Sequence, residues 1–211
     1  MTAPLSIRSE DELIAAIREA DVRLRGWDGP SSGRLIHDAT TGITVNDDGC
    51  DPSGLVYCGA VTVTVASGEA WDELVALAVE QEWVGLEALS GLPGTVGEVV
   101  SANRHAYGQS PADTVSAIHT WDRKHHARKY LPMVDCEFGD DGSRLSRELL
   151  PDRTPRFIPL KVSFLLKQGD LTTPIRDQNL TSLLGVEYGA RVALELVRER
   201  VLEQRSPAGG R

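Results

Sequence analysis

The chain has 211 residues, of which 41% are hydrophobic and 25% charged, a balance typical of a soluble globular protein with one or two small domains. Its formal net charge of −9 repels phosphate backbones over most of the surface, so the composition argues against a nucleic-acid-binding protein. A small-molecule partner fits this charge better, and the formation of a homo-oligomer is left open.

The cysteines and the first residues bear on the cellular compartment. Cys50, Cys58 and Cys136 are odd in number and lack the spacing of metal ligands, so they predict free thiols in a reducing cytoplasm. Ahead of Ser9 there is neither a long apolar run nor a charged segment leading into one. The sequence therefore predicts a cytoplasmic protein without a membrane span, a secretion signal or a metal site.

The first part of the chain predicts one helix followed by strands. Ser9 and Glu12 form a capping box ahead of apolar residues on one face, which predicts a helix over residues 10–20. A turn-forming stretch follows at residues 26–33, and it includes Trp27. Short runs with a period of two predict strands at residues 43–45, 55–57 and 61–65.

A glycine-rich stretch at residues 89–109 follows a helix that apolar spacing predicts over residues 71–83. Gly91, Gly94 and Gly97 have the spacing that lets a backbone turn tightly and present N–H groups to an anion such as phosphate. A plain connector between a helix and a strand has the same composition. Spacing alone favours neither interpretation.

The second half of the chain predicts a hairpin, a long strand and two helices. Residues 116–122 predict a strand that ends in a basic turn, where His125 and His126 predict a solvated hairpin tip. Residues 157–166 alternate as a strand, and Pro159 predicts that this strand lies at a sheet edge or beside a bulge. Helices are expected at residues 180–184 and 192–204, before a frayed tail.

The glycine-rich stretch resembles the flavin-binding loop of the UDP-N-acetylenolpyruvoylglucosamine reductases (MurB), in residues 89–97, Asn103 and residues 106–109. The similarity continues in residues 63–72, 121–122, 135–136 and 197–199. It implies a MurB-like FAD-binding fold of the PCMH type, between α/β and α+β, with a mixed sheet and flanking helices. We expect a shortened N-terminal subdomain at residues 1–42, the MurB-like flavin-fold domain at 43–205 and a disordered tail at 206–211.

Several positions depart from the family's pattern. Residues 26–33 are shorter than the family's first flavin loop, and Glu98 and His105 replace small residues of its second. Asp140 and Asp141 stand where the family has a Tyr-Arg pair whose Arg lies beside the flavin. The family's third domain, with its catalytic Ser and Glu, has no counterpart in the sequence. We therefore expect no UDP-N-acetylmuramate dehydrogenase activity.

Three functions are compatible with these departures. The first is a flavin-independent enzyme of specialised (natural-product) metabolism, a cyclase, isomerase or lyase that uses acid/base chemistry in the former flavin cleft. New ionisable groups at former cofactor positions make His105, Tyr107, Glu98 and Asp141 the candidate catalytic residues, although drift in an inactive paralogue would also explain them.

The second function is an oxidoreductase that binds FAD or FMN, and the third is a non-catalytic binding or partner protein. We expect no bound cofactor, with FAD as the alternative. A retained flavin would be bound by the loop residues Gly91, Gly94, Thr95, Val96, Gly97 and Asn103.

Overall fold

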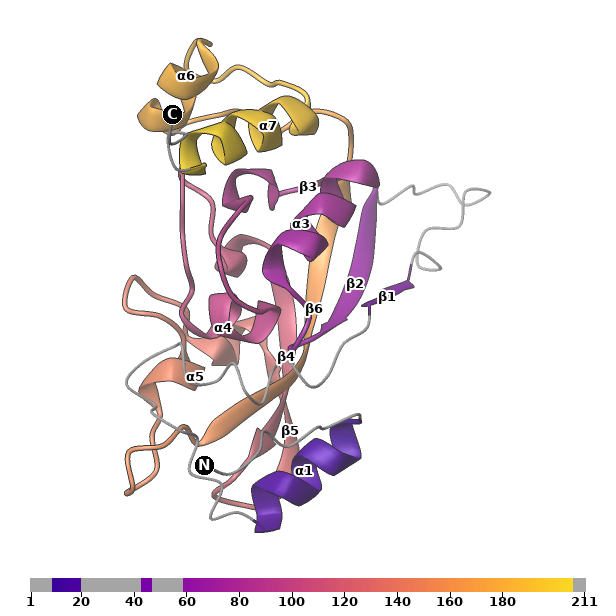
Figure 1. Ribbon diagram of the computed structural model, residues 1–211, viewed down its shortest axis with the longest axis vertical. Coiled ribbons are helices and arrows are strands. Elements are labelled where there is room, and N and C mark those ends of the chain that lie inside the picture. Colours follow the sequence, from indigo (N-terminus) through magenta and orange to yellow (C-terminus); the bar gives the residue numbers. More distant parts are fainter. Residues whose placement is uncertain (1–8, 20–42, 47–58, 207–211) are drawn as a thin grey trace.

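The computed structural model describes residues 9–19, 43–46 and 59–206 (Figure 1). The helices are α1 (Glu10–Glu19), α3 (Trp71–Glu80), α4 (Val96–Ser101), α5 (Arg144–Arg147), α6 (Gln178–Leu184) and α7 (Leu194–Arg205). The strands are β1 (Ile43–Asn46), β2 (Ala60–Ala66), β3 (Trp83–Val84), β4 (Val115–Asp122), β5 (Ala127–Pro132) and β6 (Phe157–Gln168). Three short 3₁₀ helices complete the set: η2 (Glu87–Leu89), η3 (Pro111–Asp113) and η4 (Met133–Cys136).

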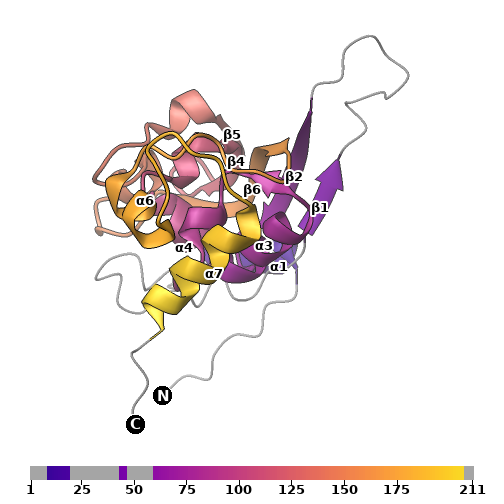
Figure 2. The same ribbon diagram turned by 90° about the horizontal axis from the view of Figure 1, so that it is seen from above.

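The strands form one six-stranded sheet in the order β1-β2-β6-β4-β5, with β3 paired to the end of β6. Every pairing among the described strands is antiparallel. The expected sheet with flanking helices is confirmed, and its antiparallel pairing places the fold at the α+β end of the expected range. Figure 2 shows α3, α4 and α7 together on one side of the sheet.

The central strand β6 contains Pro159, so the prediction of an edge strand was wrong and that of a bulge was right. The register of β4 against β6 shifts between His119, opposite Lys161, and Thr120, opposite Pro159. A proline cannot donate a ladder hydrogen bond, and the irregularity accommodates this. The freed carbonyl of Leu160 accepts the backbone N–H of Ser67 at 3.0 Å.

The main core lies between the sheet and helices α3 and α4. Trp71 is fully buried there, and its Nε1–H donates to the carbonyl of Leu89 at 3.1 Å. Phe157 belongs to this core, whereas its neighbour Ile158 packs in a smaller cluster with Leu13 of α1. Because successive strand residues face opposite sides, α1 covers the other face of the sheet at this end.

Most sequence-based predictions of single elements agree with the structure, and α3 is the main correction. This helix ends at Glu80 rather than near Trp83, because Trp83 and Val84 leave it to pair with β6 as β3. Both side chains are buried. The strand expected at residues 55–57, the turn with Trp27 and the first two cysteines lie outside the described residues. The proposed boundary at residue 42 does too, so the domain division stays a prediction.

Candidate functional site

The glycine-rich loop between η2 and α4 is held tightly against the rest of the domain. Gly91 and Gly94 adopt φ values of +71° and +110°, a region that L side chains rarely adopt. A Cβ atom at Gly91 would lie 2.9 Å from the Leu202 side chain of α7. The carbonyl of Gly94 accepts the N–H of Trp71 at 3.0 Å, which fixes the loop to the start of α3.

Glu98 folds back onto this loop. Its Oε2 accepts the backbone N–H of Thr95 at 2.9 Å, while the Thr95 hydroxyl accepts the N–H of Glu98 at 3.4 Å, so the two residues form a capping box for α4. A Cβ atom at Gly94 would lie only 2.6 Å from the same Oε2. The residue is 4% exposed, so its carboxylate is packed into the concave side of the loop.

Three further N–H groups of the loop and of the start of α4 donate to acceptors of this chain. Val96 and Gly97 each donate at 2.9 Å to a backbone carbonyl of the turn at residues 67–69. Gly91 donates to Oδ1 of Asp72 at 2.6 Å. The N–H groups of Gly91, Thr95, Val96 and Gly97 are therefore engaged by two carboxylates and two carbonyls.

Asp72 links the loop to the last helix. Arg198 of α7 donates to both of its carboxylate oxygens, at 2.7 and 2.9 Å. The hydrogen bond from Arg198, opposed by burial and helped by the Gly91 N–H, holds the pKa of Asp72 below its usual range. A cleft of about 440 Å³ opens beside this pair and is lined by Gly68, Ala70, Asp72, Gly91, Leu92, Pro93, Gly94 and Thr95.

A second cavity, of about 500 Å³, lies between the end of the glycine-rich stretch and the segment that leads into α6. Its polar lining includes Glu87, Tyr107, Gln109, Arg176 and Asp177. The Glu87 residue is 1% exposed, and its carboxylate accepts the N–H of Gly85 and the Nε2–H of Gln109, each at 2.7 Å.

Sequence reasoning missed Glu87, although a lone acid within the apolar run before the loop was a usable signal. The Oε1 of Gln109 accepts the N–H of Ala88 at 2.9 Å, which leaves its Nε2 to face the carboxylate. A buried carboxylate with two donors is held in one orientation. The cavity thus contains a fixed acid group.

Tyr107 lines the same cavity from a tight turn. Ala106 and Gln109 exchange two backbone hydrogen bonds, of 3.0 and 2.9 Å, around Tyr107 and Gly108. Both residues between them have positive φ, 51° and 76°, as a type I′ turn requires. For a tyrosine this conformation costs energy, and such strain is often found at functional positions.

The four candidate catalytic residues do not form one connected group in the described part of the chain. Glu98 is buried in its capping box, and Tyr107 is half-buried in the second cavity. His105 is exposed, and Asp141 is exposed and paired with Arg147 at 2.8 Å. No hydrogen bond or ion pair joins any two of the four, so their catalytic roles stay predictions. The side chain of Asn103, a candidate flavin ligand, bridges neighbouring loops instead, through Gly139 and Ala112.

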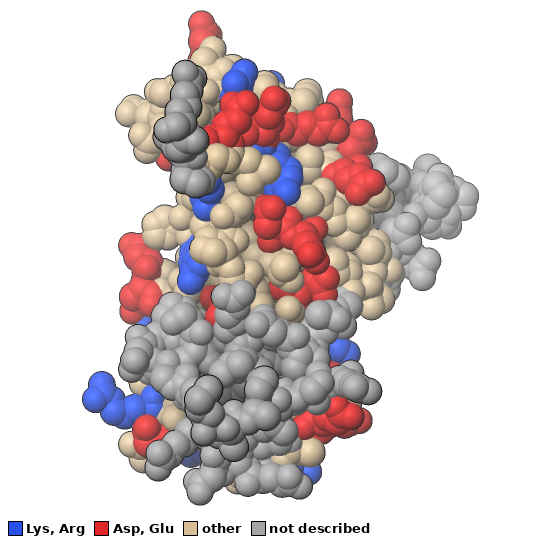
Figure 3. All heavy atoms as spheres, viewed as in Figure 1, with Lys and Arg blue, Asp and Glu red and all other residues tan. Residues whose placement is uncertain are grey.

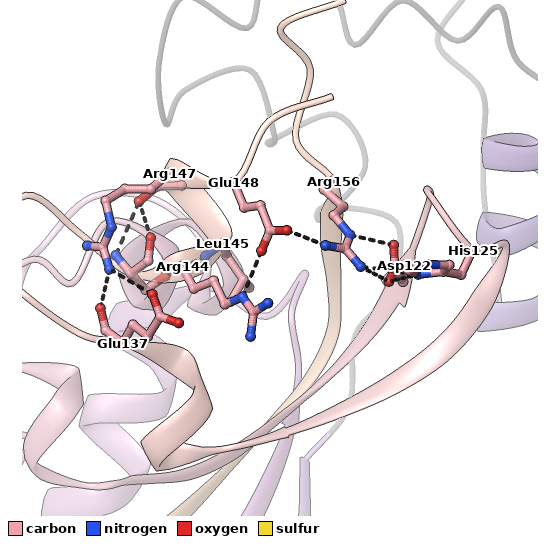
Figure 4. Close-up of polar contacts among 10 residues, drawn as sticks. Asp122, His125, Glu137, Arg144, Leu145, Arg147, Glu148 and Arg156 are labelled. Carbon is pink, nitrogen blue, oxygen red and sulfur yellow. Dashed lines mark hydrogen bonds and ion pairs between the residues drawn. The ribbon is translucent and has the colours of Figure 1, made fainter. Parts of the chain in front are cut away.

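An ion-pair network crosses the far end of the sheet (Figure 4). Arg156 donates to both oxygens of Asp122 at 2.9 and 2.7 Å and also pairs with Glu148, which in turn accepts Arg144 Nε–H at 2.7 Å. His125 Nδ1 lies 2.7 Å from Asp122. Burial alone would raise the pKa of Asp122, but these hydrogen bonds hold it well below the usual range.

Further groups bear on metal binding, thiol chemistry and membranes. Cys136 is buried, and burial raises the pKa of its thiol to about 12. Within residues 9–19, 43–46 and 59–206, no cluster of three or more His, Cys, Asp or Glu side chains could hold a metal ion. Nor does any helix in these ranges have the length and apolarity needed to cross a bilayer.

The sheet, the glycine loop packed between α3, α4 and α7, and the adjoining clefts together define an α+β domain with a glycine loop beside a cleft. A family model described as "FAD binding domain" matches residues 3–124. The chain belongs to this family.

The chain is also similar to curated reductases and to one solved structure. UDP-N-acetylenolpyruvoylglucosamine reductase of Cutibacterium acnes is 36% identical over 212 residues, which cover 95% of this chain and 53% of the relative. The reductase of Streptomyces coelicolor is 33% identical over 215 residues, which cover 99% of this chain and 53% of the relative. The chain thus spans about half the length of these curated relatives. The match to the crystal structure of MurB from Thermus caldophilus covers 66% of this chain and 40% of the MurB chain, with a TM-score of 0.45 and 22% identity.

Proposed function

We propose that the chain acts on a small molecule by acid/base chemistry, without bound flavin, in the cavity lined by Glu87, Tyr107 and Arg176. The observation that carries this proposal is the buried Glu87 carboxylate, held by two hydrogen bonds at the wall of a cavity of about 500 Å³. Concave sites with a few oriented polar groups are the usual place for small-molecule chemistry. Of the four candidate catalytic residues expected from the sequence, Tyr107 lines this cavity.

FAD is the cofactor that the family implies, and the glycine loop does not fit it in this chain. A diphosphate needs donors, yet the N–H groups of Gly91 and of residues 95–98 already donate within the chain. Acidic side chains are also prominent on the face that carries α3 and α7 (Figure 3). We therefore propose acid/base chemistry without a redox step, of the cyclase, isomerase or lyase type, in specialised metabolism.

Three of the lining residues have a role in this proposal. Glu87 would take a proton from the substrate, since its orientation is fixed and general bases must lie within hydrogen-bond reach. Arg176 would attract an anionic group of the substrate, because a guanidinium pairs well with carboxylate or phosphate. The hydroxyl of Tyr107 would orient a substrate oxygen. A cytoplasmic setting agrees with the buried free thiol of Cys136.

The test is proton exchange in deuterated water. The purified chain is incubated with a panel of keto acids, hydroxy acids and sugar phosphates, and loss of carbon-bound protons is followed by NMR. We expect exchange of at least one compound, reduced about a hundredfold or more in Glu87→Gln. Exchange that Glu87→Gln leaves unchanged, or a panel without any exchange, would count against the proposal.

A second candidate is an FAD-binding oxidoreductase related to the reductases that the relatives' names describe. It is favoured by the family assignment and by the positive φ of Gly91 and Gly94 beside a cleft of about 440 Å³. The visible spectrum of the purified chain separates the two candidates. A colourless protein agrees with the first, and one flavin per chain after gel filtration establishes the second.

A further inference from the structure

We propose that Glu98 is the residue that excludes the family's dinucleotide from the glycine loop, because its carboxylate takes the position and the donor that a phosphate oxygen would use. The inference rests on the proposed flavin-free function and supplies a physical cause for it. It concerns one side chain, and it predicts that a single substitution restores affinity for a diphosphate.

Glu98 occupies the space beside the loop backbone. Oε2 of Glu98 is 2.9 Å from the N of Thr95 and only 2.6 Å from where a Cβ of Gly94 would stand. A glycine at such a point leaves room for a ligand to approach the backbone. Here the space is filled from within the chain, by a carboxylate that is itself an oxyanion.

The carboxylate of Glu98 also brings negative charge to the loop. Glu98 is 4% exposed, so its negative charge is poorly screened by solvent, and Asp72 adds a second carboxylate on Gly91 of the same loop. The charge of Asp72 is paired with Arg198, so the like charge that a diphosphate brought to this loop would meet is that of Glu98. Like charges at close range oppose binding most strongly where water is excluded.

The exclusion of a diphosphate by Glu98 is distinct from its capping of α4. A capping box works equally with Glu or Gln at the third position, because both supply an acceptor oxygen for the N–H at the start of the box. The cap between Thr95 and Glu98 therefore does not need the charge. Glu98→Gln keeps the cap and removes the repulsion, and Glu98→Ala also empties the space beside Gly94.

The experiment measures binding of FAD and of ADP to the full chain by titration calorimetry, with melting curves to verify folding. Three variants are compared with the wild type: Glu98→Gln, Glu98→Ala and the control Asp113→Asn. Asp113 accepts the N–H of Ser110 at 2.7 Å in a capping box of the same type, outside the glycine loop. Asp113→Asn therefore removes one negative charge from a capping box, as Glu98→Gln does.

We expect no saturable binding by the wild type or by Asp113→Asn. We expect saturable binding of both probes by Glu98→Gln, at least tenfold tighter than the weakest binding that the titration detects, about 1.4 kcal/mol, and a further gain in Glu98→Ala. If folded Glu98→Gln and Glu98→Ala gain nothing over a non-binding wild type, the role of Glu98 is refuted while the flavin-free function stands. Stoichiometric flavin in the wild type would refute both, and an equal gain in Asp113→Asn would show a general charge effect and refute the role of Glu98.

Discussion

Arg198 and Asp72 form a two-pronged ion pair, with N–O distances of 2.7 and 2.9 Å, across 126 positions of the sequence. Asp72 also accepts the N–H of Gly91, so one carboxylate joins α3, α7 and the glycine loop. The glycine loop and α7 are therefore held together by this carboxylate. A substitution in either one should change the stability of the other.

Arg198→Ala should lower the free energy of unfolding by about 1–3 kcal/mol, because it leaves a partly buried carboxylate without its charged partner. Arg198→Lys should recover little, since an ammonium cannot pair with both oxygens at once. Urea unfolding followed by circular dichroism measures both. Arg200→Ala is the control in the same helix, because Arg200 forms an exposed pair with Glu203 and should cost less than about 1 kcal/mol. Equal losses of unfolding free energy at the two positions would contradict a special role for the ion pair between Arg198 and Asp72.

Stability should fall in acid through Asp122. Its folded-state pKa is held below the unfolded value of about 3.9, so the folded chain binds fewer protons than the unfolded chain in this range. The contribution of Asp122 is thus fully present above about pH 4 and is lost as pH falls towards the folded pKa.

Asp122→Asn should flatten the acid limb of a plot of melting temperature against pH. At neutral pH it should cost about 1–3 kcal/mol, since Arg156 would lose one charged partner and keep Glu148. An acid limb as steep as that of the wild type would show that other carboxylates dominate acid unfolding.

Gly94→Ala should destabilise the chain by more than Gly185→Ala does. Both glycines have positive φ, +110° and +68°, so both substitutions incur backbone strain of about 1–2 kcal/mol. Only at Gly94 would the new Cβ also meet the Glu98 carboxylate, at 2.6 Å, whereas nothing lies within 4 Å at Gly185. Combining Gly94→Ala with Glu98→Ala should remove the additional destabilisation that Gly94→Ala shows over Gly185→Ala. Equal melting temperatures for the two single variants would contradict the packing of Glu98 on the loop.

Cys136 should resist alkylation in the native chain. Its thiol is fully buried and its pKa is raised to about 12, so almost no thiolate is present at neutral pH. Peptide mass spectrometry after brief iodoacetamide treatment reports the site directly. We expect modification of Cys136 only after denaturant is added, and rapid native labelling would show that the segment around η4 opens.

Local patterns predicted the elements well, because period-two alternation and capping signals act within a few residues. The helix that begins after Ser9 and the strand around Val63 are such cases. The central position of β6 could not be derived in this way, since Pro159 argues for an edge and only the register shift against β4 shows how it is accommodated.

The site was less predictable, since its contacts are nonlocal. The resemblance identified the glycine loop, and Glu98 does carry its charge into it as the sequence suggested. Spacing could not show that Asp141 pairs with Arg147, or that His105 is exposed. Glu87 and Gln109 are 22 positions apart and share a hydrogen bond that no local pattern encodes.

The central position of β6 has a consequence for biosynthesis. The hydroxyls of Thr64 and Ser163 lie 3.0 Å apart on β2 and β6, yet 99 positions separate them along the chain. At elongation rates of about 5–20 residues per second, β2 waits roughly 5–20 seconds on the ribosome for its partner strand. During this time its apolar residues, Val61, Val63 and Val65, cannot be buried against β6. The nascent chain should therefore be a client of ribosome-associated chaperones until β6 has emerged from the exit tunnel.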